Sequence, residues 1–183
     1  MQSMHAFVYI ILVANHVETT ESLNEKGHSQ LKPLTLGMCG YSVLRPLQNQ
    51  DFYYNAFDWL KQFRVDVESW HTETGPGVFE AAILYQEAKE MGDRGTLFKT
   101  SMKQIGLKHN VMPSFMAKPY GDQPGCSGHM HFSLKNENGD NVFAIGEPSN
   151  DVPNLTKDAV WFLAGVLRGL PSILAILAPT VNR

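Results

Sequence analysis

The run GHMHFSL (128–134) alternates polar and apolar residues, and this pattern restricts the backbone to an extended strand. On a β-strand, successive side chains point to opposite faces. The polar positions are His129, His131 and Ser133, and the apolar positions are Met130, Phe132 and Leu134. We therefore expect one face to pack in a core and the other to present two imidazoles and a hydroxyl. A His-x-His pair also fits a half-buried strand whose polar side faces water, so further ligands are needed to indicate a site.

Composition and charge exclude several classes of protein. The chain has 183 residues, of which 43% are hydrophobic and 18% charged, which suits one globular domain with a core. The net charge of −3 offers no basic surface for nucleic acid. Two cysteines, Cys39 and Cys126, do not make a disulfide framework, so we expect a reducing compartment, the cytoplasm.

Hydrophobic periodicity predicts most of the secondary structure. Residues 51–63 read as a helix with one apolar face, formed by Phe52, Ala56, Trp59, Leu60 and Phe63. A second helix is expected over 96–110, with Leu97, Phe98, Met102 and Ile105 facing inward. Strands are expected over 63–70 and 78–87, joined by a turn at 74–77, and a further turn over 135–141. Residues 15–36 show no period and predict a loop.

Two apolar segments could be mistaken for membrane spans. AFVYIILVA (6–14) is far shorter than the roughly 20 residues of a span, and no Lys or Arg precedes it as in a signal peptide. We expect a buried strand there. AVWFLAGVLRGLPSILAIL (159–177) has a helical pattern, but Arg168 and Pro171 argue against a span. We expect this segment to be a helix of the core, and no association with a membrane.

Acidic residues gather upstream of the alternating strand. Glu80 lies between Phe79 and Ala81, and a carboxylate in an apolar strand is costly unless it is paired, hydrogen-bonded or bound to metal. Taken alone, Glu80 also fits a surface strand with its carboxylate in water. The wider set of candidates is Glu68, His71, Glu73, Glu80, His129 and His131. Carboxylates with an occasional imidazole suit Mg²⁺ or Mn²⁺ better than zinc.

Several motifs together resemble the glutamine synthetase family. KPYGDQPGCSGHMHFSL (118–134) is similar to its ATP-binding signature, and ESWHTETGPGVFE (68–80) to the metal-binding stretch upstream. LAILAPTVN (174–182) resembles its Pro-Thr-x-Asn element, and MCGYSVLRP (38–46) the segment before the metal strands. The residues of the motifs WHTE and PGCSGHMH are most similar to those of the family branch that includes fungal FluG-type proteins. The resemblance implies an α+β fold with a curved, mainly antiparallel sheet and flanking helices.

The resemblance also implies roles for individual residues. Glu73 and Glu80 match carboxylate ligands of the family's first metal, and His129 matches the imidazole ligand of the second. Glu68, His131 and Ser133 match positions that contact ATP. Gly125 and His71 match residues of the glutamate substrate site. The implied cofactors are ATP and Mg²⁺ or Mn²⁺, and the implied reaction joins the glutamate γ-carboxylate to ammonia or another amine through γ-glutamyl phosphate.

The chain departs from the family pattern in three respects. No apolar strand with Glu-x-Glu, which supplies one ligand to each metal in the family, is found in the sequence. Pro124 stands where ammonia-using members commonly carry Asn, which leaves room for another amine. The sequence stops at Asn182-Arg183, where the family would continue with further arginines and a flap glutamate. We therefore expect residues 30–183 to form a partial catalytic domain, 1–29 to be a segment of uncertain origin or not native to the fold, and the chain alone to be inactive.

Three functions remain open on the sequence. The first is an ATP-dependent ligase of glutamine synthetase type, a homo-oligomeric ring in a full-length form. The second is a non-catalytic relative with a structural or assembly role. The third is a cupin-type barrel in which His129, His131 and a glutamate would bind iron.

Overall fold

The computed structural model describes residues 2–14, 24–25 and 32–179, and for 2–14 it describes the backbone alone. The elements in chain order are β1 (Gln2–Ala14), α2 (Leu44–Leu47), α3 (Gln50–Gln62), β2 (Val67–Thr72), β3 (Val78–Glu87), α4 (Ala88–Lys108), β4 (Val111–Ser114), β5 (Gly128–Leu134) and α5 (Lys157–Leu177).

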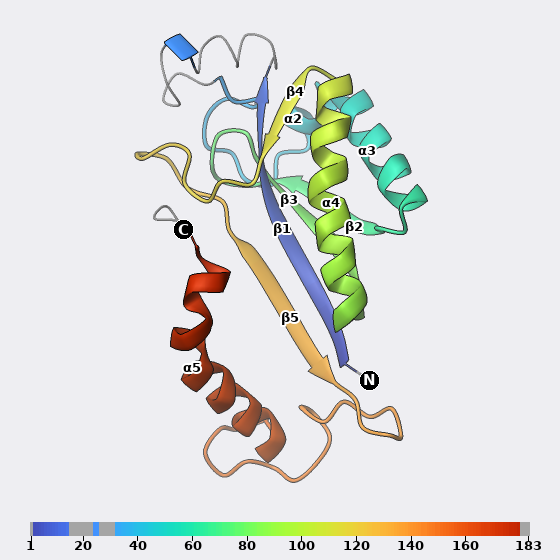
Figure 1. Ribbon diagram of the computed structural model, residues 1–183, viewed down its shortest axis with the longest axis vertical. Coiled ribbons are helices and arrows are strands. Elements are labelled where there is room, and N and C mark those ends of the chain that lie inside the picture. The colour runs from blue at the N-terminus through green and yellow to red at the C-terminus, as the bar shows by residue number, and fades with distance from the viewer. Residues whose placement is uncertain (1, 15–23, 26–31, 180–183) are drawn as a thin grey trace.

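The strands form one antiparallel sheet organised around β1. The order is β2-β3-β1-β4, and β5 pairs with β1 as well. Strand β3 runs along one edge of β1, while β5 and β4 share the other edge, with β5 on residues 2–8 and β4 on residues 11–14 (Figure 1). The expected α+β fold with a mainly antiparallel sheet is confirmed.

Strand β1 lies within the segment predicted to be of uncertain origin, 1–29. Its residues 2–14 pair with three other strands, so this part of the segment belongs to the sheet. The strand predicted at 6–14 is present and begins earlier, at Gln2. Most of the predicted loop over 15–36 falls on residues 15–23 and 26–31, which lie outside the described residues. The proposed boundary near residue 29 stays a prediction.

The predicted helix over 51–63 is confirmed, but the strand that follows begins later than expected. Helix α3 ends at Gln62, and Arg64 then adopts a left-handed backbone conformation with φ of 61°. The amide of Val65 donates to the carbonyl of Leu60, which closes the end of the helix. These residues reverse the chain and cannot join the sheet, so β2 begins at Val67 and not at 63.

Helix α4 is longer than the sequence indicated. It begins at Ala88, eight residues before the predicted start, and its first turns include Gly92 and Gly95 together with the buried residues Met91 and Arg94. The predicted inward residues Phe98, Met102 and Ile105 are buried, but Leu97 is 39% exposed, since the packed face continues through Met91 instead. Glycine lowers helix propensity by about 1 kcal/mol relative to alanine, and tertiary packing outweighs this cost here.

The core lies between the sheet and the two helices α3 and α4. Phe79, Ala81 and Ile83 alternate along β3 and all face this core. Helix α3 adds Phe52, Tyr53, Ala56 and Leu60, and α4 adds Met91, Phe98, Met102 and Ile105. Phe63, predicted on the packed face of α3, is 53% exposed because the helix has ended before it.

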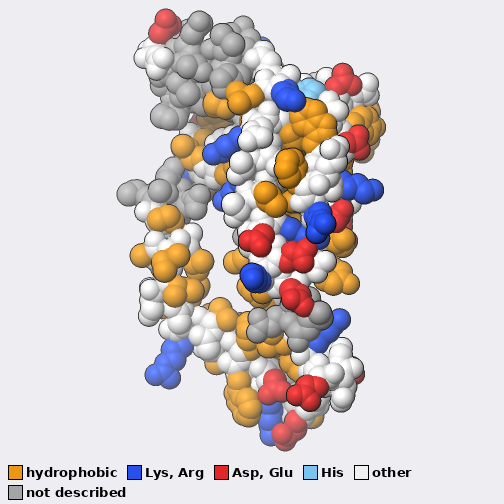
Figure 2. Space-filling model, turned by 45° about the vertical axis from the view of Figure 1, so that its right-hand side comes forward, with side chains coloured by type: hydrophobic (Ala, Val, Ile, Leu, Met, Phe, Trp, Pro, Cys, Tyr) orange, Lys and Arg blue, Asp and Glu red, His pale blue; other side chains and the backbone are white. Residues whose placement is uncertain are grey.

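Helix α5 is not the buried helix that we expected. Thr156 caps its first turn by accepting a hydrogen bond from the amide of Ala159, and Ala159 is its single buried residue among those described. Hydrophobic side chains such as Trp161, Leu167 and Ile176 are exposed along the helix (Figure 2). By length and composition alone α5 could cross a membrane, a property that core helices of soluble proteins share.

The apolar face of β5 is likewise more exposed than predicted. Met130 is 56% and Phe132 47% exposed. The reason is the position of the helices: α3 packs against β2, and α4 against β4, β1 and β3 (Figure 1). Strand β5 instead meets α5, where the ring centroids of Phe132 and Phe162 are 6.2 Å apart.

The core packing can be tested at Phe98, which is fully buried and contacts the rings of Trp70 and Phe115. We expect Phe98→Ala to lower the free energy of unfolding by about 3–5 kcal/mol, because the cavity cannot close between helix and sheet. Urea unfolding followed by circular dichroism measures this. Tyr54→Ala, at an exposed position of α3, should change stability far less, and equal losses would contradict the assignment of the core.

Candidate metal centre on the sheet

The functional side chains lie on the face of the sheet that the helices do not cover. In β3 the core takes Phe79 and Ala81, so Glu80 between them points to the opposite face. His71 pairs directly with Glu80 across the β2–β3 ladder and therefore shares its face. Trp70 pairs with Ala81 and packs against the core. The alternation of two strands thus brings an imidazole and a carboxylate together.

His71, Glu73 and Glu80 form one compact group. A ligand atom of each lies within 4.8 Å of the others. His71 Nε2 is 3.4 Å from Glu80 Oε2, and His71 Nδ1 is 3.6 Å from Glu73 Oε1. Glu80 is only 8% exposed, so its carboxylate requires a partner of opposite charge or a hydrogen-bond donor.

The orientation of the His71 ring suits a metal ligand. Its Nδ1 is 3.2 Å from the carbonyl oxygen of Thr72. When Nδ1–H donates to this carbonyl, the lone pair is on Nε2, the atom that faces Glu80. Two carboxylates and one imidazole are a donor set that fits Mg²⁺ or Mn²⁺, with water or phosphate oxygens completing the coordination.

A tight turn between β2 and β3 holds Glu73 in position. The Glu73 amide donates to the carbonyl of Val78, and Gly77 has a left-handed φ of 68° that favours glycine. The Gly77 amide donates to both the carbonyl and the hydroxyl of buried Thr35. A Cβ on Gly75 would come within 2.8 Å of the carbonyl oxygen of Pro124, so the glycine-rich loop lies against this turn.

A loop before α2 covers the imidazole, and it contains a residue that we did not predict. The amide of Tyr41 donates to the carbonyl of Thr72, and the Thr72 hydroxyl donates to the carbonyl of Cys39. These bonds stack the Tyr41 ring on His71, with centroids 4.5 Å apart and planes inclined by 21°. Tyr41 falls in the motif MCGYSVLRP, which resembles a segment of the family, but the sequence did not indicate a role for this tyrosine.

The carboxylates raise the pKa of the Tyr41 phenol above its ordinary value of 10.0. The negative charge of Glu73 is the largest cause, followed by desolvation and by the charge of Glu80. The phenol therefore stays neutral at physiological pH. Glu73 and Glu80 bring two formal negative charges to the group of three residues, which a cation would offset.

Strand β5 brings His129 to the same face without joining it to the group. Glu80 pairs with position 9 of β1 and His129 with position 7, and positions two apart share a face. His131 and Ser133 continue on this face along β5. His129 lies one strand beyond Glu80, with β1 between them, and is not among the three grouped ligands. Its Nε2 is 3.3 Å from the hydroxyl of Ser127.

The two remaining predicted residues lie at the edges of this face. Glu68 is exposed where the β2–β3 register shifts, near the start of β2. Gly125 is exposed in the loop before β5, and a Cβ there would come within 2.4 Å of the Ala117 carbonyl oxygen, so packing alone requires glycine. Its neighbour Cys126 is buried, and burial raises the pKa of the thiol to about 11, which favours the protonated thiol at neutral pH.

Comparisons with known proteins identify the family. The chain matches the family described as glutamine synthetase, catalytic domain, over residues 9–183. It is 46% identical over 169 residues to Type-1 glutamine synthetase 2 of Dictyostelium discoideum, which covers 92% of this chain and 32% of that protein. It is 33% identical over 147 residues to glutamate–isopropylamine ligase of Pseudomonas sp., covering 80% and 31%. The chain therefore belongs to the glutamine synthetase family.

The structural likeness agrees with this assignment. The cryoEM structure of Plasmodium falciparum glutamine synthetase superposes with a TM-score of 0.78 at 18% identity, over 99% of this chain and 38% of that one. The match includes α5, which is thus part of the catalytic-domain fold.

The cupin-type barrel is wrong, because alternating histidines occur on any strand with one polar face and do not specify the fold. The chain spans about a third of the length of the curated relatives it matches. The resemblance to the FluG-type branch stays a prediction.

The electrostatics of the site can be tested through Tyr41. We expect Glu73→Gln to lower the pKa of the Tyr41 phenol towards 10.0, since it removes the largest cause of the upward shift. Glu80→Gln should lower this pKa by less. Ultraviolet titration of tyrosinate, with the curve of Tyr41→Phe subtracted, isolates this phenol. Glu87→Gln, at an exposed position, serves as control, and an unchanged pKa in Glu73→Gln would refute the geometry.

Proposed function

We propose that the domain belongs to an ATP-dependent ligase that joins the γ-carboxylate of glutamate to ammonia or another amine. The observation that carries this proposal is the group formed by His71, Glu73 and buried Glu80 on the open face of the sheet. Family membership supplies the class of reaction, and the donor set supplies a place for the cation that such a reaction requires.

The reaction has two steps, and the first brings together two anions that repel each other. A glutamate γ-carboxylate oxygen attacks the γ-phosphorus of ATP, which forms γ-glutamyl phosphate and releases ADP. The amine nitrogen then attacks the acyl carbon, phosphate leaves, and the nitrogen loses a proton. A bound Mg²⁺ or Mn²⁺ would neutralise charge and align the reacting oxygens. Glu73, Glu80 and His71 would hold it on the glutamate side of the site.

The nucleotide would lie along β5. We assign His129 to a second cation that engages the ATP phosphates, His131 and Ser133 to ATP contacts, and Glu68 to the ribose side. The shared face of the three β5 residues supports one common ligand. Gly125 would lie beside glutamate, where the loop approaches the turn that carries Glu73.

The proposal does not fix which amine is the acceptor. The carbonyl of Pro124 lies against Gly75, in the turn next to Glu73. Pro124 replaces the Asn that ammonia-using members commonly carry, so this difference lies close to the candidate metal centre. One relative is named a glutamine synthetase and another a glutamate–isopropylamine ligase. We therefore propose testing both ammonia and isopropylamine. A homo-oligomeric ring and a cytoplasmic location are further proposals from the family.

A non-catalytic structural role is the second candidate, and β1 favours it. The sequence QSMHAFVYIILVA has no carboxylate, although its positions 7 and 9 lie between the strands of His129 and Glu80. Each metal would then depend on fewer protein ligands, and binding would be weak. Formation of a γ-glutamyl amide by a full-length form supplied with glutamate, ATP, Mg²⁺ and ammonia or isopropylamine supports the ligase. A full-length form that makes a stable oligomer without turnover supports the structural role.

Metal binding can be tested on the chain itself. We expect Glu80→Gln to weaken Mn²⁺ binding by at least about tenfold, because it removes a ligand. Tyr9→Glu should tighten binding, because position 9 pairs with Glu80 and adds a carboxylate to the same face. Electron paramagnetic resonance of free Mn²⁺ measures both. Glu137→Gln, in an exposed turn, is the matched control, and equal affinity of Glu80→Gln and Glu137→Gln would reject the metal centre.

The roles on β5 predict an order of effects in the active enzyme. We expect His129→Ala to lower kcat by at least about 100-fold, since a metal ligand stabilises charge at the transferring phosphoryl group. Ser133→Ala removes one neutral hydrogen bond and should raise the KM for ATP by about tenfold or less. Glu68→Ala should resemble Ser133→Ala. Steady-state kinetics with ATP varied measures this order, and equal losses for His129→Ala and Ser133→Ala would exclude His129 as a metal ligand.

A further inference from the structure

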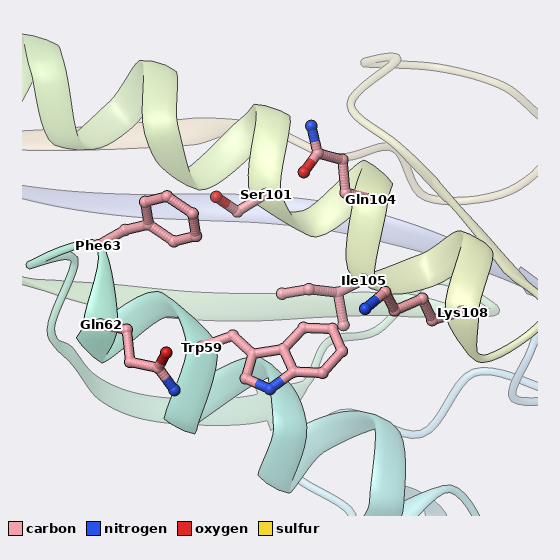
Figure 3. A pocket seen from close by; sticks show the side chains of 7 residues that line it. All are labelled: Trp59, Gln62, Phe63, Ser101, Gln104, Ile105 and Lys108. Carbon is pink, nitrogen blue, oxygen red and sulfur yellow. The ribbon is translucent and has the colours of Figure 1, made fainter.

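A hollow on the outer side of the helical layer is unrelated to the metal centre. It lies between α3 and α4 and has a volume of about 250 Å³ (Figure 3). Its lining consists of Trp59, Gln62, Phe63, Ser101, Gln104, Ile105 and Lys108. The helices α3 and α4 cover the core face of the sheet, whereas His71 and Glu80 lie on the opposite face. A ligand in this hollow would therefore not contact the proposed substrates.

The walls of the hollow are apolar and aromatic. Trp59 and Phe63 line it from α3 and the residue after it, and Ile105 lines it from α4. Phe63 is 53% exposed, which leaves a ring edge or face for a further apolar group. A ring packed against aromatic side chains gains hydrophobic burial and a directional ring contact. The walls thus suit an aromatic or compact aliphatic body.

Lys108 gives the hollow its charge. Among the described residues that line it, Lys108 is the one with a formal charge at neutral pH. Its ammonium lies 4.5 Å from the centre of the Trp59 ring, a cation–π contact that holds the charge above the aromatic wall (Figure 3). Gln62 and Gln104 are exposed at the rim and carry amide donors. An anionic group at the mouth would meet one cation and up to two amides.

The volume limits the size of the ligand. A dry protein cavity of about 150 Å³ is known to hold a benzene molecule. The hollow, at about 250 Å³, therefore accommodates one six-membered ring with a short side chain. Nucleotides are larger than this space and would leave most of their surface outside.

We propose that this hollow is a binding site for a small aromatic carboxylate, with its ring against Trp59 and Phe63 and its carboxylate on Lys108. The contact is a salt bridge with an ammonium that the Trp59 ring already orients. An aromatic amine of the same size would place a positive charge beside Lys108 and is disfavoured. Affinity is expected to be in the millimolar range because the site is open to solvent on one side.

The experiment uses the chain with phenylacetate as probe and the indole N–H signals in a ¹H–¹⁵N NMR titration as readout. The three tryptophans, Trp59, Trp70 and Trp161, give separate signals that single Trp→Phe variants assign. We expect phenylacetate to shift the Trp59 signal, with Trp161 on α5 unaffected. Phenethylamine, of similar size and opposite charge, should bind at least about tenfold more weakly.

Charge-removing variants separate this site from nonspecific binding. Lys108→Met keeps the apolar stem and should weaken phenylacetate binding by about tenfold, whereas Lys108→Arg should retain it. Lys103→Met is the matched control, since Lys103 is exposed on the same helix outside the hollow. Equal binding of phenylacetate and phenethylamine overturns the proposal, as does an equal loss in both methionine variants. No shift of the Trp59 signal up to about 10 mM phenylacetate overturns it as well. These outcomes do not depend on ATP or metal, so they are independent of the proposed ligase function.

Discussion

Strand β3 satisfies two opposite requirements on its two faces, and the rest of the structure follows from this. Phe79, Ala81 and Ile83 are buried under α3 and α4, and this burial contributes to the hydrophobic stabilisation of the fold. Glu80 on the same strand is almost as buried but carries a charge, and a buried carboxylate without a partner would destabilise the fold. The neighbouring strand places His71 directly across the ladder, so a cation held between the imidazole and the carboxylate would be that partner. The core and the candidate metal centre are therefore two faces of the same strand.

The turn and the covering loop extend this pair into a site. Glu73 is brought back over the sheet by a turn whose glycines are required by a left-handed φ and by a close contact with Pro124. The Tyr41 amide donates to the Thr72 carbonyl and the Thr72 hydroxyl donates to the Cys39 carbonyl, and these bonds hold the Tyr41 ring against His71. Every ligand is thus fixed by backbone interactions, which keeps three polar side chains in place before any cation binds.

The central strand has a different character from its neighbours. Strand β1 lies between the strand of Glu80 and the strand of His129, yet its sequence offers no carboxylate. The distance between the two halves of the site is set by this one strand. A catalytic role requires that the metals bind without carboxylate ligands from β1. A structural or assembly role has no such requirement. The hollow between α3 and α4 lies on the opposite side of the sheet from the candidate metal centre, so it has no part in holding the metals.

Sequence alone determined the parts that depend on local pattern. The strand over 128–134, the strand that carries Glu80, the helical face of Phe52, Ala56 and Leu60, and the glycine turn at 74–77 follow from local sequence, and the structure has them. The motifs were specific enough to indicate the family. Tertiary structure alone decided which residues meet: His71 joined Glu73 and Glu80, while His129 remained one strand away. It also decided that α5 and Phe132 are exposed and that α4 continues through two glycines. Burial and strand pairing join residues far apart in the chain, and a periodic pattern carries no information about which neighbour will cover a face.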